Sequence, residues 1–95
     1  MNILSENIVT FVNSFVKRLR NEGTNLRNTV NFYDEFFTID VHKSFTKIDK
    51  TFSYSKVYSY DKINAYAIDN IENIVGEEIK ILRKKYWEFF DQEFN

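Results

Sequence analysis

The sequence predicts a small α+β domain with the element order α-β-β-β-α. In it, one face of a three-stranded antiparallel meander is covered by an N-terminal helix and a long C-terminal helix. Apolar residues recur every three or four positions near both ends of the chain and alternate with polar residues in the middle. Ninety-five residues provide for one hydrophobic core, so residues 1–95 are expected to form a single domain. Ten Phe, six Tyr and one Trp make that core aromatic.

The first helix is expected over residues 3–20. Apolar residues from Ile3 to Leu19 recur at spacings of three and four, which gives this helix a wide apolar face. Gly23 follows as a residue that accepts the left-handed conformation common after a helix C-terminus. The last turn carries a basic cluster, where the helix dipole favours cations: Lys17, Arg18 and Arg20.

Residues 26–60 alternate between apolar and polar side chains, which predicts three antiparallel strands. A two-residue turn at Asp34-Glu35 pairs Phe32 with Phe37 in the first hairpin. A helical reading of residues 26–37 remains open, because their apolar residues also fit a spacing of about four.

The second hairpin is expected to turn at Asp49-Lys50, which pairs Phe45 with Tyr54. The two turns, chosen separately, place the apolar residues on one face of the sheet, and such agreement is expected of a fixed register. This register also puts Lys56 opposite Lys43, an unfavourable pair of like charges. The other face is expected to meet solvent and carries Arg27, Thr29, Asp40, His42, Ser44, Thr46, Ser53, Ser55 and Ser59.

A second helix is expected over residues 61–91, where the period returns to 3.6. Gly76 interrupts the apolar stripe without shifting its phase, which favours one continuous helix. A straight helix of this length spans about 45 Å, so it either projects from a domain of this size or breaks. The stripe consists of Ile63, Ala67, Ile71, Val75, Ile79, Leu82, Tyr86 and Phe89.

The stretch TFSYSKVYSY at residues 51–60 places aromatic residues at alternate positions. We interpret this stripe as core, because the alternate face is Ser and Thr and two helices need an apolar surface to cover. In the alternative, bases stack on the Tyr rings and lysines hold phosphates, which would make the chain a weak single-stranded nucleic-acid binder. That face would consist of Lys43, Tyr54, Lys56, Tyr58 and Tyr60.

The sequence predicts no catalytic, cofactor or metal site. Without Cys, the chain cannot build thiolate zinc sites or thiol nucleophiles, and its single His excludes a metal site with several His ligands. His42 and Asp40 on the open sheet face have no obvious nucleophile or pocket beside them. Glu72, Glu77 and Glu78 read as a solvated helix face with i,i+3 pairing rather than as metal ligands. An enzyme is therefore the disfavoured class.

A net charge of −1 gives no bulk attraction to nucleic acid or to an anionic membrane. The sequence has no apolar run of membrane-spanning length and no signal-peptide pattern, so we expect a soluble, cytoplasmic protein. A second basic cluster, Arg83, Lys84 and Lys85, would meet the first one only if the two helices run parallel.

The C-terminal segment RKKYWEFFDQEF holds the main candidate site. Trp87 is expected on nearly the opposite side of the helix from the core stripe. A Trp bordered by Arg and Phe on a charged helix face has the composition of a protein-interface anchor. The predicted partner interface consists of Arg83, Trp87, Phe90 and Phe94.

These observations favour a small non-enzymatic protein-interaction module. Abundant Asn, Ile, Lys, Phe and Tyr match AT-rich codons and suggest a phage or mobile-element protein that binds and blocks a host protein. Small phage inhibitors, including several anti-CRISPR proteins, likewise pack a few strands on helices, and the chain is similar to them only at that level. A homodimer through the same helix is compatible with this hypothesis. The alternatives are the nucleic-acid binder above and a small structural protein of a phage particle.

Overall fold

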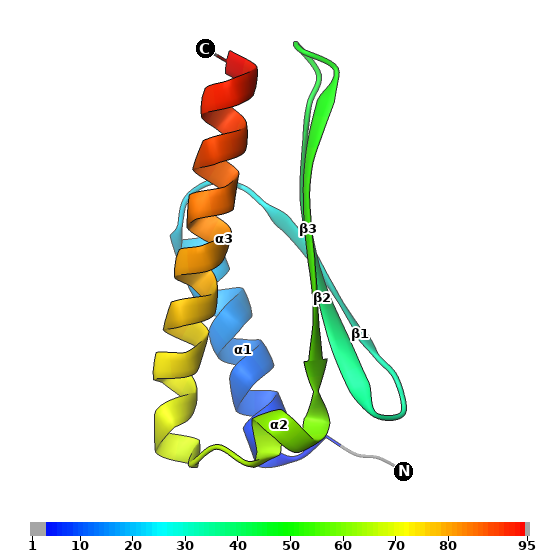
Figure 1. The fold of residues 1–95 in the computed structure, drawn as a ribbon, viewed down its shortest axis with the longest axis vertical. Coiled ribbons are helices and arrows are strands. Elements are labelled where there is room, and N and C mark those ends of the chain that lie inside the picture. Colours follow the sequence, from blue (N-terminus) through cyan, green and yellow to red (C-terminus); the bar gives the residue numbers. More distant parts are fainter. Residues whose placement is uncertain (1–3, 95) are drawn as a thin grey trace.

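The computed structural model describes residues 4–94 and has the predicted α-β-β-β-α order (Figure 1). Three strands form one antiparallel sheet in the order β1-β2-β3, and α1 and α3 lie along one of its faces. A short helix and a 3-10 turn connect the sheet to α3. The elements are α1 (Glu6–Asn21), β1 (Arg27–Phe32), β2 (Phe36–Phe45), β3 (Lys50–Ser59), α2 (Tyr60–Asn64), η1 (Ile68–Asn70) and α3 (Ile71–Phe94).

Helix α1 begins and ends at residues whose chemistry explains its bounds. The Ser5 hydroxyl accepts a hydrogen bond from the Ile8 backbone N–H at 3.2 Å, which satisfies one of the free donors of the first turn. The predicted start at Ile3 lies outside the described residues. At the other end, Gly23 takes a positive φ of 72°, as expected of the residue that terminates the helix.

The first hairpin has the predicted register, with Phe32 opposite Phe37. The backbone N–H of Tyr33 donates to the Phe36 carbonyl at 2.9 Å and closes the two-residue turn at Asp34-Glu35. The helical alternative for residues 26–37 is therefore wrong, because residues 27–32 and 36–45 are paired strands.

The predicted register of the second hairpin is wrong by four residues. Phe45 pairs with Lys50 rather than Tyr54, and the loop runs from Thr46 to Asp49. Asp49 has a positive φ of 54°, a conformation that Asp tolerates better than most residues. Because the slip is an even number, the apolar residues stay on the predicted face.

The predicted lysine pair does not form. Lys56 lies opposite Ile39, and Lys43 lies opposite Phe52. Each lysine therefore has an apolar cross-strand neighbour and no like charge directly across from it.

The predicted continuous helix over residues 61–91 is also wrong. The chain forms α2, leaves the helix at Ala65 and re-enters it at Ile71. The Asn7 side-chain amide donates to the carbonyls of Ile63 at 3.0 Å and Tyr66 at 2.8 Å, which holds the break against α1. Ala67 is consequently exposed, whereas the chain stays helical through Gly76.

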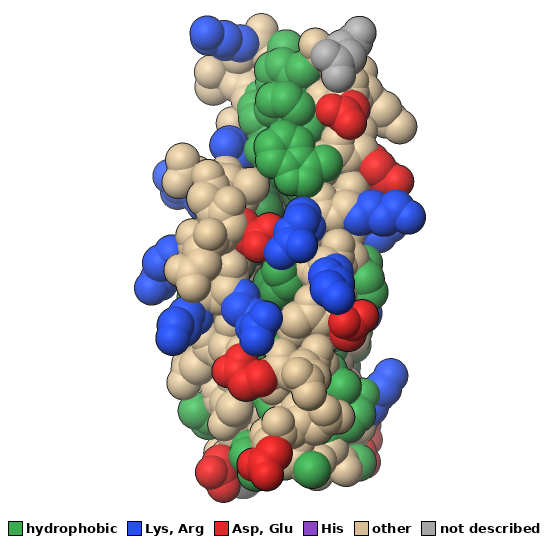
Figure 2. Space-filling model, turned by 90° about the vertical axis from the view of Figure 1, so that its left-hand side faces the viewer, with side chains coloured by type: hydrophobic (Ala, Val, Ile, Leu, Met, Phe, Trp, Pro, Cys, Tyr) green, Lys and Arg blue, Asp and Glu red, His purple; other side chains and the backbone are tan. Residues whose placement is uncertain are grey.

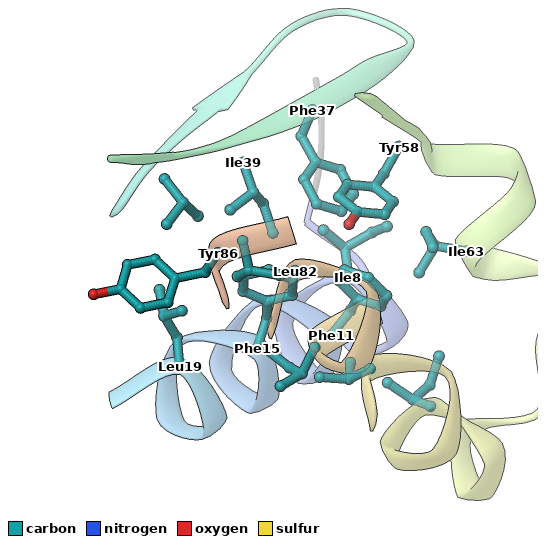
Figure 3. Packing of buried hydrophobic residues seen from close by; sticks show 14 of the residues in the cluster. Ile8, Phe11, Phe15, Leu19, Phe37, Ile39, Tyr58, Ile63, Leu82 and Tyr86 are labelled. Atoms are coloured by element: carbon teal, nitrogen blue, oxygen red, sulfur yellow. The ribbon is translucent and has the colours of Figure 1, made fainter. Parts of the chain in front are cut away.

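Aromatic and aliphatic side chains from both helices and the sheet form one core (Figure 3). Phe11 of α1 lies against Tyr58 of β3, with 4.9 Å between ring centroids, and against Phe37 of β2 at 5.8 Å. Phe37 and Phe11 are fully buried. The TFSYSKVYSY stripe therefore faces the core as predicted, with Phe52 and Tyr58 buried within it.

Helices α1 and α3 run parallel but do not end together. Ser14 of α1 contacts Glu72 of α3, and Glu22, just after α1, contacts Arg83. The last turns of α3 and the tip of the β2–β3 hairpin continue beyond the end of α1 (Figure 1). One end of the 44 Å long molecule therefore has one helix over the sheet instead of two.

Candidate interaction surface

The four residues predicted as a partner interface lie together on one flank of α3. At about 100° per residue, their positions fall within an arc of about 60° on the helix. Hydrophobic side chains gather on this surface over the upper part of the molecule (Figure 2). Trp87 is 45% exposed and Phe94 39% exposed, whereas Phe90 is half-buried. We call this surface the C-terminal patch: Arg83, Trp87, Phe90 and Phe94.

The aromatic rings of the C-terminal patch contact one another. Trp87 and Phe90 have centroids 5.2 Å apart in an edge-on arrangement, and Phe90 stacks on Phe94 at 4.5 Å. Trp87 also meets the buried Tyr86 edge-on at 5.0 Å. These contacts hold the rings in fixed positions, so little side-chain freedom remains to be lost when a partner binds.

Phe45 supports the patch from the sheet side and was not predicted as part of the site. Its ring meets Phe94 at 5.2 Å and Phe90 at 6.3 Å. Alternation alone placed Phe45 among the apolar residues of the sheet. Its contact with the end of α3 depends on how far α3 extends along the hairpin, which no local pattern encodes.

Arg83 marks the boundary between the C-terminal patch and the two-helix part of the molecule. Its guanidinium donates to both carboxylate oxygens of Glu22, from Nε at 2.7 Å and from Nη2 at 2.8 Å. The hydrogen bond from Arg83 is the main cause that lowers the pKa of Glu22, while partial burial opposes it. The only predicted cation of the interface thus has an internal partner.

The patch continues the surface that α1 covers lower on α3. Glu72 accepts a hydrogen bond from Ser14 of α1, and Gly76 lines the same groove as Arg18. Both lie on the same flank of α3 as Arg83. Trp87 follows one turn later, where α1 has ended. It lies about 100° around the helix from Tyr86, closer to the core than the nearly opposite position that the sequence suggested.

Of the five residues in the alternative nucleic-acid face, Tyr58 is buried and the other four are partly covered. Tyr58 is 7% exposed, and its hydroxyl donates to Glu78 Oε1 at 2.8 Å. The same carboxylate binds Lys56 Nζ at 2.6 Å. Burial first, and then the hydrogen bond with Glu78, raise the pKa of the Tyr58 phenol.

The other residues of that face are also engaged or half-covered. Lys43 Nζ donates to the Thr24 carbonyl at 2.7 Å, and the Tyr60 hydroxyl donates to the Tyr33 carbonyl at 2.7 Å. Tyr54 is half-buried, and desolvation is the main cause that raises its pKa. The rings are therefore not arranged as an open platform of the kind on which bases stack.

An open groove of about 760 Å³ lies between α1 and α3, and residues from both basic clusters line it. The parallel helices bring Lys17 and Arg18 to the same groove as Arg83. Acidic residues alternate with them: Arg18 pairs with Glu72 at 3.3 Å. The Ser14 hydroxyl donates to Glu72 and is the main cause that lowers the pKa of this carboxyl. The groove therefore has mixed charge rather than the character of an anion site.

The residues considered for catalysis or metal binding do not converge. On the open face, Asp40 accepts hydrogen bonds from Asn31 at 3.0 Å and from Ser55, while His42 lies between Arg27 and Ser53. Within residues 4–94, no three His, Cys, Asp or Glu side chains are grouped as metal ligands. Over the same span, no helix combines the length and the apolar character needed to cross a membrane.

Comparison of the chain with protein-family models, with curated proteins and with solved structures found no match.

Proposed function

We propose that this chain is a non-enzymatic protein-interaction module that binds another protein through the C-terminal patch. The observation that carries the proposal is an exposed, ordered group of aromatic rings where the molecule loses its second covering helix. Water-exposed aromatic clusters are costly, and they recur at protein-binding sites where a partner removes them from solvent.

Trp87 is the proposed anchor of this surface. It combines the largest side chain with an exposed fraction of 45%, and neighbouring rings fix its position. Tryptophan is enriched among residues whose truncation costs most binding energy, because a single ring displaces much water. Phe90 and Phe94 extend the contact along α3 toward its C-terminus.

The proposed mode of action is steric. A small phage or mobile-element protein that covers a functional surface of a host protein inhibits it without chemistry of its own, in the manner of counter-defence inhibitors. The codon-related composition and the small size support this proposal. The partner is a protein with an apolar surface large enough to cover the rings of the patch.

The test is affinity capture from a lysate of a low-GC bacterium, with the native protein and Trp87→Ala as bait. Ile81→Ala is the matched control, because Ile81 is 42% exposed on another face of the same helix. We expect a partner that the native protein and Ile81→Ala retain and that Trp87→Ala loses. Retention at raised salt would support an apolar interface, whereas a phosphate-driven complex would weaken steeply. Equal recovery with all three baits, each shown to be folded, would refute the proposed surface.

A further inference from the structure

We infer that a second copy of this chain covers the C-terminal patch in a two-fold symmetric dimer. In this dimer, the two α3 helices run antiparallel and overlap over residues 83–94. The inference rests on the proposed function, because it takes the patch to be a protein-binding surface and assigns its occupant in the free protein.

The order of residues in the patch is self-complementary. Arg83, Trp87, Phe90 and Phe94 follow at intervals of four, three and four, so the series reads alike in both directions. A two-fold axis between residues 88 and 89 places Trp87 of one copy against Phe90 of the other, and Arg83 against Phe94. The Trp87–Phe90 contact and the Arg83–Phe94 contact each occur twice, as a closed two-fold interface requires.

The charges beside the patch are complementary in the same arrangement. Lys84 and Asp91 border the patch on the side of α3 that faces away from the sheet, about 20° apart around the helix. Both are exposed, and neither forms an ion pair within residues 4–94. The antiparallel overlap brings Lys84 of each copy near Asp91 of the other, because corresponding flanking positions meet in such helix pairs. A parallel two-fold overlap would instead put the two Lys84–Asp91 flanks on opposite sides of the interface, where these charges could not pair.

The fold leaves space for the second helix. Helix α1 ends beside Arg83, so the surface of α3 from Arg83 to Phe94 has no covering helix. The partner helix would occupy this length in line with α1. Its C-terminal turn would reach Arg83, whose positive charge suits the negative end of a helix dipole.

The overlap is short, about 18 Å at 1.5 Å per residue. Interfaces of this size are small, so we expect a reversible dimer whose population depends on concentration. Trp87 is the only Trp, so its fluorescence reports directly on the burial of the patch.

The test is sedimentation velocity of the purified full chain and two charge-reversal variants, Lys84→Glu and Asp91→Lys. We expect the native protein to dimerise and each variant alone to dimerise about tenfold more weakly, because each opposes like charges twice. An equimolar mixture of the two variants restores both opposite-charge pairs, so it should dimerise as tightly as the native protein. Lys85→Glu, the same charge change on another face of α3, is the matched control and should dimerise normally.

A native protein that stays monomeric, or a mixture no tighter than either variant, would overturn the inference. A blue shift of Trp87 emission with concentration should accompany dimerisation, and its absence would count equally against it. The two proposals fail separately. If no dimer forms but the protein captures another protein in a Trp87-dependent way, the dimer is refuted and the proposed function stands. If the mixture of the two charge variants dimerises but the lysate yields no captured partner, only the self-association stands.

Discussion

Arg83 on α3 forms a bidentate ion pair with Glu22, the residue that follows the last turn of α1. This pair joins the C-terminus of one helix to the middle of another at the point where two-helix packing stops. It fixes the lower edge of the C-terminal patch and leaves the aromatic rings above it uncovered. One ion pair thus separates the packed part of the helix layer from the exposed part.

Glu22→Gln should destabilise the protein in a pH-dependent way. The folded-state pKa of Glu22 lies below its ordinary value of 4.5, so this carboxylate stabilises the fold at neutral pH and loses that effect as the pH falls through its folded-state pKa. Urea unfolding followed by circular dichroism should show native protein and variant differing most at pH 7, and the difference should shrink as the pH falls below 4.5. A difference that stays constant down to pH 3 would contradict this role.

Gly76→Ala should stabilise the protein by about 0.5–1 kcal/mol, because glycine disfavours the interior of a helix. An added Cβ would lie 3.2 Å from Nη1 of Arg18. That atom is the end of a flexible, partly exposed side chain, so it can move by a few tenths of an ångström. Chemical denaturation measures the change. A loss of stability would mean that the Arg18–Glu72 contact does not adapt.

Phe37→Ala should cost about 3–5 kcal/mol, a large share of the stability of a small domain. Phe37 is fully buried and contacts the rings of Phe11, Tyr58 and Tyr60. Its neighbour Phe36 is 37% exposed on the other side of the strand and provides the control. Phe36→Ala should cost about 1 kcal/mol or less, and equal losses for the two variants would contradict the sheet orientation.

Tyr58→Phe should remove a hydrogen bond worth about 1 kcal/mol near neutral pH. The pKa of the Tyr58 phenol is raised above its ordinary value of 10.0, so its protonated form stabilises the fold below pH 10 and this contribution is lost in stronger alkali. Stability should therefore fall above pH 10 more steeply in the native protein than in the variant. Tyrosinate absorbance should also show one late-titrating group that Tyr58→Phe lacks.

The face assignment of the sheet was predictable because a period of two decides which side chains are buried. The register of β2 against β3 was not, because registers that differ by an even number bury the same residues. The turn at residues 46–49 contains no glycine, and Asp49 supplies the left-handed residue instead. No simple turn motif marked that loop in the sequence.

The break between α2 and α3 could not be predicted from the sequence, for a related reason. Ile63 and Ile71 are both buried and lie eight residues apart, which is compatible with one continuous helix. The interruption depends on Asn7 of the distant N-terminal helix, whose side-chain amide donates to the freed carbonyls of Ile63 and Tyr66. The spacing of Arg83, Trp87, Phe90 and Phe94 was enough to predict that they share one flank of a helix, but their position beyond the end of α1 follows only from the relative lengths of the two helices.

The unequal helix lengths also have a consequence for hydrogen exchange. Backbone amides around Phe11 and Phe37 are shielded by two helices and a sheet, so their exchange should require opening of the whole molecule. Amides in the hairpin loop and the last turns of α3 have a single layer above them and should exchange through local fluctuations. A binding protein could therefore slow exchange at this end while leaving the rest of the chain unchanged.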